Sequence, residues 1–162
     1  MSENSGTDQL LQQTCEEIVT AIATVIDAEP AASKKVLRLP DGPELGRQIS
    51  IDATEPGGPA NTCRMSILNT ELAPAGEVAR IEYEHERQGK YGIHKVYSVQ
   101  SVRRQAGRLV LLENFLADNP ALVREADFRP IASEAYAKKS VLKSVNDWSL
   151  YRAWQLQETR RS

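Results

Sequence analysis

The chain has few of the residues that usually mark a function. It contains two cysteines, two histidines and 6% aromatic residues. No apolar run approaches the roughly 20 residues that a membrane-spanning helix needs. The first residues, MSENSGTDQLLQQ, have neither a basic segment nor an apolar stretch and are not typical of a secretory signal. Cys15 and Cys63 are far apart in sequence, and we expect each to behave as a small hydrophobic residue rather than to form a disulfide. This favours a reducing compartment, the cytoplasm.

Motifs for catalysis or nucleotide binding are also lacking. No serine lies in a Gly-x-Ser-x-Gly elbow, and neither cysteine has a histidine near it in sequence. The glycine clusters EPGGPAN (55–61) and APAGE (73–77) lack the Gly-Lys-Ser/Thr of a phosphate loop, so we interpret them as turns. The sequence therefore predicts no cofactor and no metal site, and it favours a non-catalytic protein.

The length and composition of the chain are typical of one globular domain, and its charges are separated between its two ends. The chain has 162 residues, 41% of them hydrophobic, and a net charge of −2. Residues 1–33 carry six acidic and no basic side chains, whereas residues 138–162 carry six basic and two acidic ones. Such an asymmetry serves partner recognition or self-association, unless the two ends simply pack near each other.

Apolar periodicity predicts a helix at each end. In residues 8–27 apolar side chains recur every three or four positions, as in Leu11, Cys15, Ile18, Ile22 and Val25. Thr7 is the expected N-cap, and Pro30 ends the helix. From Ser133 a second stripe predicts a helix to about residue 157 that buries Trp148. We expect flexible tails at 1–6 and 159–162 around a single domain, 7–158.

Between the helices, five segments are predicted to be strands: most alternate with the period of two that is typical of strands, and RLVLLENFL (108–116) is apolar on both faces and should be covered on both sides. A turn at Gln88-Gly89 predicts that Tyr83 pairs with His94, and a turn at Ala106-Gly107 predicts that Val102 pairs with Leu111. The expected fold class is α+β, an antiparallel sheet of about five strands flanked by an N-terminal helix and a long C-terminal helix. The expected core face holds Ile81, Val96, Val102, Leu109, Leu111 and Phe115.

Both histidines lie in one hairpin, YEHERQGKYGIHK (83–95). The expected register places His85 and His94 diagonally on one face, beside Tyr83. Zinc needs three or four ligands, and Glu84 and Glu86 point to the other face, so we expect no metal there. Tyr83, His85 and His94 remain candidates for a catalytic or small-molecule site, and the simplest interpretation is a half-buried histidine in a hairpin.

A second candidate site is a basic surface for nucleic acid. Seven basic residues lie at one hairpin tip or in the aromatic-containing C-terminal helix: Arg103, Arg104, Arg108, Lys138, Lys139, Lys143 and Arg152. Basic side chains among aromatic ones bind phosphates and stack on bases. The chain's pI of about 5.8 argues against this function.

The favoured hypothesis is a chaperone-like adaptor or assembly protein that binds another protein and self-associates. It rests on the missing catalytic constellation, the separated charge and a broad apolar stripe on the N-terminal helix. In layout alone, the expected order of elements is similar to that of bacterial secretion chaperones. A nucleic-acid accessory protein and a small-molecule binder or enzyme are the alternatives, and no membrane partner is expected.

Overall fold

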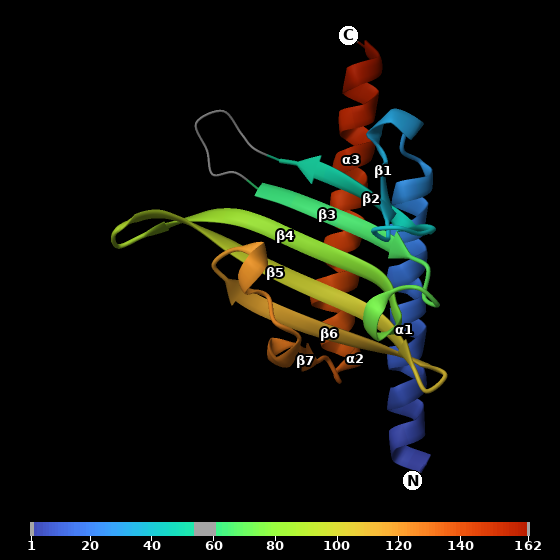
Figure 1. The fold of residues 1–162 in the computed structure, drawn as a ribbon. Coiled ribbons are helices and arrows are strands. Elements are labelled where there is room, and N and C mark those ends of the chain that lie inside the picture. Colours follow the sequence, from blue (N-terminus) through green and yellow to red (C-terminus); the bar gives the residue numbers. More distant parts are fainter. Residues whose placement is uncertain (1, 54–60, 162) are drawn as a thin grey trace.

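Two long helices cover one face of an antiparallel sheet in the computed structural model, which describes residues 2–53 and 61–161 (Figure 1). Residues 54–60, which include most of the expected turn at 55–61, lie outside the described residues. The helical elements are α1 (Ser2–Asp27), η1 (Ala31–Ser33), η2 (Pro74–Gly76), η3 (Pro120–Leu122), η4 (Glu125–Asp127), α2 (Glu134–Tyr136), the π-helix η5 (Ala137–Leu142) and α3 (Lys143–Arg161). The strands are β1 (Lys35–Arg38), β2 (Glu44–Asp52), β3 (Asn61–Leu68), β4 (Glu77–Gly89), β5 (Gly92–Gln105), β6 (Arg108–Ala117) and β7 (Arg129–Pro130).

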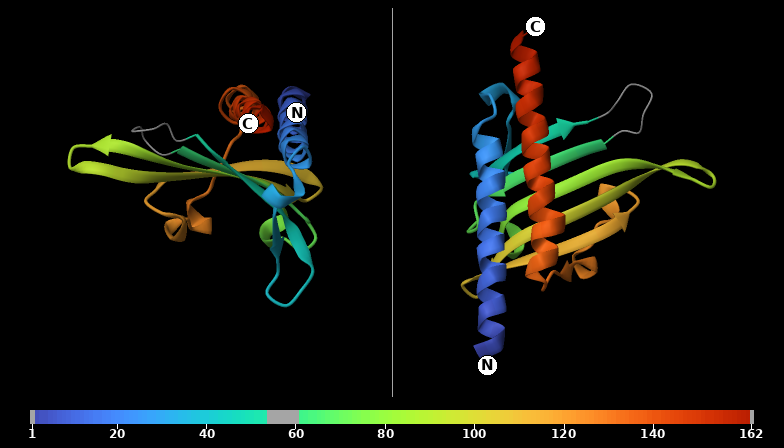
Figure 2. Two further views of the ribbon diagram at one scale, coloured as in Figure 1. Left: turned by 90° about the horizontal axis from the view of Figure 1, so that it is seen from above. Right: turned by 180° about the vertical axis from the view of Figure 1, so that it is seen from behind.

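The described strands follow one another across the sheet in chain order, each antiparallel to the next. Figure 2 shows α1 and α3 side by side on one face, running in the same direction, so that the N-terminus, at the start of α1, and the C-terminus, at the end of α3, lie at opposite ends of the helix layer. This arrangement confirms the α+β class and the two flanking helices. None of the helices in the described part of the chain has the length and apolar character to cross a membrane.

The sheet has seven described strands, so the expected number of about five was too low. The two that were missed are the edge strands β1, with four residues, and β7, with two. Segments so short carry too little alternation to be recognised, and short edges also limit pairing with other chains. The helices are longer than expected, since α1 starts at Ser2 and α3 continues to Arg161.

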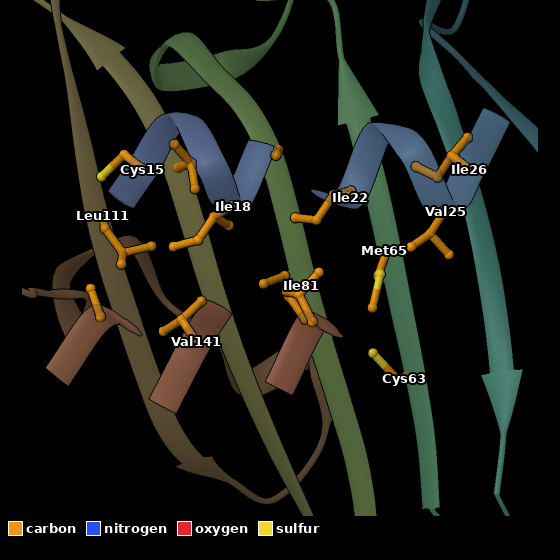
Figure 3. Close-up of a cluster of buried hydrophobic side chains, with 14 of the residues drawn as sticks. Cys15, Ile18, Ile22, Val25, Ile26, Cys63, Met65, Ile81, Leu111 and Val141 are labelled. Atoms are coloured by element: carbon orange, nitrogen blue, oxygen red, sulfur yellow. The ribbon is translucent and has the colours of Figure 1, made fainter. Parts of the chain in front are cut away.

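The core lies between the helices and one face of the sheet (Figure 3). The stripe of α1 is buried as expected, with Cys15, Ile18 and Ile22 fully inaccessible. Five of the six side chains expected on the core face are also buried; the exception is Phe115, which is 47% exposed. The α1 stripe is thus used within the domain, as burial of apolar surface requires.

The two hairpin predictions differ in outcome. The Ala106-Gly107 turn is confirmed, with Val102 paired to Leu111. The β4–β5 register was wrong: Gly89 pairs with Gly92, and Tyr83 pairs with Ser98 rather than with His94. The turn therefore lies at residues 90–91, two positions beyond the expected one, which shifts the partner of each residue by four.

The opposite charges of the two ends meet within the domain. Arg152 on α3 donates two hydrogen bonds to Glu29, which follows α1, at 2.6 and 2.8 Å. Glu29 is 4% exposed. Part of the charge asymmetry is therefore explained by the packing of the two ends against each other.

Candidate ligand-binding site

The sheet extends beyond the helix layer on the side of α3 that faces away from α1 (Figure 2). There the long β4–β5 hairpin projects past α3, and the helix-facing side of its strands is only partly covered. A cavity of about 540 Å³ lies in this angle between sheet and helix. Its size is within the range of roughly 300–1,000 Å³ that is typical of small-molecule sites.

Two groups of side chains form the cavity. Strands β4, β5 and β6 supply the floor, and the start of the C-terminal helical segment supplies the wall. The lining residues are Tyr83, His85, Arg87, Val96, Ser98, Gln100, Phe115, Tyr136, Ser140 and Ser144. The mixture of apolar surface with a few polar groups is what a site for an organic ligand requires.

Two of the residues that line this cavity each have a buried polar atom without a hydrogen-bond partner. These atoms are the hydroxyl oxygen of Tyr83 and Oε1 of Gln100, and the whole Gln100 residue is only 5% exposed. The Ser144 hydroxyl lies close enough to Tyr83 to influence its pKa, but it forms no hydrogen bond of normal geometry with it. A buried polar atom without a partner costs about 1–3 kcal/mol, so the cavity has unused hydrogen-bonding capacity.

The surroundings favour the uncharged forms of Tyr83 and His85 in the cavity. Burial raises the pKa of Tyr83, with the Cys63 thiol adding to the effect. Burial also lowers the pKa of His85, and the nearby positive charge of Arg87 lowers it further. A neutral imidazole and a neutral phenol therefore line a cavity in which Arg87 supplies the positive charge.

The helical wall departs from regular α-helix at the cavity. Residues 137–142 form the π-helix η5, between α2 and α3. Its wider turn carries Ser140, while Tyr136 precedes it and Ser144 follows it, so all three line the same cavity. Single π-turns inside helices cost stability and are frequent at functional sites.

Tyr136 is held in place across the gap between helix and sheet. Its hydroxyl lies 3.0 and 3.3 Å from the two carboxylate oxygens of Glu113 on β6. Burial raises the pKa of Glu113, while this hydrogen bond lowers it. The contact fixes one wall of the cavity, and Glu113 itself is not among the lining residues.

The three side chains expected at the hairpin are only partly brought together. Tyr83 and His85 line the cavity, whereas the exposed His94 is paired with Arg87 further along the hairpin and does not line it. The two histidines are still diagonal neighbours, because His85 pairs with Val96, two residues from His94. No cluster of three metal-ligating side chains occurs in the described part of the chain.

Five of the seven basic residues proposed for nucleic acid form ion pairs with acidic side chains. Arg103 is 4% exposed, binds Glu125 at 3.0 Å through Nη2 and lies over the ring of Phe128. Arg108 contacts Asp8, and Arg152 binds Glu29. Lys138 and Lys143 pair with Glu134 and Asp147, each four residues away along the C-terminal helical segment, and Arg104 and Lys139 are exposed. Nucleic-acid binding stays a prediction.

The other face of the sheet carries a network of charged side chains. Arg64 on β3 reaches Glu82 and Glu84 on β4, each at 3.4 Å, and Arg80 reaches Glu77 and Glu82 at 3.2 Å. Tyr97 donates a hydrogen bond to Glu82, and burial with that contact raises the pKa of Tyr97 to about 12. These opposite charges compensate one another across neighbouring strands.

Several residues of the cavity had no role in the sequence analysis: Arg87, Ser98, Gln100, Tyr136, Ser140 and Ser144. Phe115 was expected on the core face and instead lines the cavity. One signal was present, since Ser98 and Gln100 are polar residues at positions of β5 that alternate onto the core face. The rest depends on how the helix packs on the sheet. No family model, curated protein or solved structure matches the chain.

Proposed function

We propose that the protein is a non-catalytic binder of a small organic molecule, which it holds in the cavity between the β4–β5 hairpin and the C-terminal helical segment. The observation that supports this function is a pair of buried, unpartnered polar atoms on Tyr83 and Gln100, two residues that line a cavity of about 540 Å³. A ligand that bonds to them removes the cost of leaving them unpaired.

The same geometry favours binding over catalysis. A histidine that acts as acid or base needs a partner to orient its ring. Among the described residues, His85 has no side-chain hydrogen bond to a carboxylate, and the lining contains no acidic residue. The cavity thus supports recognition without supplying a general acid–base pair.

The test is a fragment screen by two-dimensional NMR on the full chain. Ligand binding is expected to shift the backbone amide signals of residues around Tyr83, Gln100 and Ser140. The variant Ser140→Phe fills the cavity and should abolish these shifts while leaving the rest of the spectrum intact. The matched control is Ser50→Phe, at an exposed position on the other face of the sheet, which should leave binding unchanged. Fragments that bind both variants equally would contradict the proposal.

A self-associating assembly protein is the second candidate, and one observation favours it. Leu150 and Trp154, one turn apart on α3, are 71% and 54% exposed. Large apolar side chains on one helix face are typical of contact surfaces. Light scattering at low and high salt tests this function: a dimer that persists in salt and is lost in Leu150→Lys supports it, and a monomer throughout contradicts it.

A further inference from the structure

The cavity has a direction, set by the strand register. Along the helix-facing side of β4 the order from the core outward is Ile81, Tyr83, His85 and Arg87, and Gln100 on β5 pairs with Ile81 at the inner end. Residues in a strand advance about 3.3 Å each, so along the backbone Arg87 lies about 13 Å from Tyr83 and about 20 Å from the level of Gln100. A ligand that uses both ends must be elongated.

The two ends of this path differ in chemistry. At the inner end lie two buried, unpartnered atoms: Oε1 of Gln100, which can only accept a hydrogen bond, and the Tyr83 hydroxyl, which can donate or accept one. At the outer end the guanidinium of Arg87 stands beside the imidazole of His85. Among the ion pairs of the described residues none includes Arg87, so its charge has no carboxylate partner there.

Between the two ends the walls are apolar or aromatic. Val96 and Phe115 come from the sheet, and the ring of Tyr136 comes from the helical side. Phe115 was expected in the core but is 47% exposed, which leaves part of its surface available to a ligand. Aromatic and aliphatic walls of this kind suit the flat body of an organic molecule.

We propose that the ligand is an elongated aromatic carboxylate whose acidic group binds Arg87 and His85 and whose far end carries a hydroxyl or amino donor for Gln100. This inference rests on the proposed function and adds the chemical class of the ligand. Arginine binds carboxylates through two parallel hydrogen bonds, which positions the acid as well as attracting it. A site built to pair a buried acceptor discriminates strongly against a ligand that lacks the donor.

The test compares three compounds of nearly equal shape by NMR titration: 4-hydroxycinnamate, its methyl ester, and cinnamate, which lacks the hydroxyl. The hydroxy acid is expected to bind at least tenfold more tightly than either of the other two. Its binding should shift the NMR signals of residues at both ends of the cavity. Equal binding of acid and ester overturns the acidic end of the proposal, and equal binding of the two acids overturns the donor end.

Two variants test whether Arg87 binds the acidic end of the ligand and Gln100 the donor end. In Arg87→Gln the advantage of acid over ester should disappear, while the advantage of hydroxycinnamate over cinnamate remains. In Gln100→Leu the reverse is expected. Arg87 is exposed, so its replacement leaves the core unchanged; thermal unfolding of both variants verifies that they fold. A preference for the acid that persists in Arg87→Gln contradicts the assignment.

The outcome separates the ligand class from the proposed function. If none of the three compounds binds, the ligand class is wrong, and the fragment screen with Ser140→Phe still decides whether the cavity binds small molecules. If fragments bind there but show no preference for acids, the function holds and the inference fails. If no fragment of any class binds, both are overturned.

Discussion

The guanidinium of Arg152 forms two hydrogen bonds with the carboxylate of Glu29, through Nη2 at 2.6 Å and through Nε at 2.8 Å. The Glu29 side chain is 1% exposed, whereas that of Arg152 is 19% exposed. The pair connects the end of α1 to α3. Because the carboxylate is the more deeply buried partner, the two residues contribute unequally to stability when one is removed.

Arg152→Ala should therefore destabilise the protein more than Glu29→Ala does. Removing the arginine leaves a buried carboxylate without compensation, which costs about 3–5 kcal/mol in comparable pairs. After Glu29→Ala the guanidinium retains access to water, so a smaller loss is expected. Urea unfolding of both variants measures the difference, and a larger loss in Glu29→Ala would contradict this account.

An exposed ion pair on the same helix provides the control. Lys143 and Asp147 lie 2.7 Å apart, with side chains 66% and 59% exposed. Exposed pairs of this kind contribute only about 0.3–0.5 kcal/mol. Lys143→Ala should accordingly change the free energy of unfolding far less than Arg152→Ala does.

The turn between β5 and β6 offers a stabilising substitution. Ala106 has φ +52° and Gly107 φ +75°, so both central residues of the turn are in the left-handed region. Alanine is strained there, whereas Asn-Gly is the preferred pair for this turn type. Ala106→Asn should raise the free energy of unfolding by about 0.5–1 kcal/mol, measured as a higher urea midpoint.

A substitution at the neighbouring glycine, Gly107→Ala, should lower the free energy of unfolding. An added Cβ at Gly107 meets no atom within 4 Å, so any cost of Gly107→Ala comes from its positive φ and not from a clash. A loss of about 1 kcal/mol is expected. If both substitutions in the turn were neutral, backbone strain would not be the determinant of its stability.

The register error in the β4–β5 hairpin shows what alternation alone can and cannot predict. The expected and observed partners of Tyr83 differ by four residues, an even number. Since side chains alternate with period two, an even shift leaves every residue on its original face. Tyr83, His85 and His94 were therefore assigned to the correct face although the position of the turn was wrong.

The cavity was beyond the reach of sequence patterns because it depends on how separate elements pack. Gln100 belongs to it through the pairing of β5 with β4, and Ser140 through a π-turn that apolar periodicity does not reveal. Phe115 was expected in the core because it alternates with Leu109 and Leu111. Only the position of the helical segment on the sheet shows that it lines an open cavity.

Both cysteines should be unreactive in the folded protein. Burial raises the pKa of Cys15 to about 11, with Glu16 adding to the effect, and burial raises that of Cys63 further. The thiolate is the reactive form, so a thiol reagent at pH 8 should label neither residue until the chain unfolds. Labelling in water and in urea measures this.

An exposed thiol supplies the comparison for that experiment. Ser50 is exposed on the face of the sheet opposite the core, and Ser50→Cys should react at the rate of a free thiol under the same conditions. In that variant one thiol should be labelled in water and three in urea. Rapid labelling of Cys15 or Cys63 in the folded native chain would show that the core opens easily.

The lowered pKa of His85 makes the stability of the protein depend on pH in a defined direction. Burial, and then the charge of Arg87, hold this pKa below the ordinary value of about 6.5. Above that value the imidazole is neutral in both the folded and the unfolded chain, so it does not make the free energy of unfolding depend on pH. As the pH falls through 6.5 the unfolded chain takes up the proton more readily than the folded one, so the free energy of unfolding decreases.

The other charged or titratable side chains that line the cavity with His85 are Tyr83, Arg87 and Tyr136, and none is a carboxylate that would favour its protonation. His85→Gln removes this titration, so the loss of stability between pH 7.5 and pH 5 should be smaller in the variant than in the native chain. His94→Gln, at an exposed position, is the matched control. Urea unfolding at the two pH values measures each difference. An equal pH dependence in native chain and His85→Gln would mean that the imidazole titrates as it does in water, and the cavity would then be wetter than its geometry indicates.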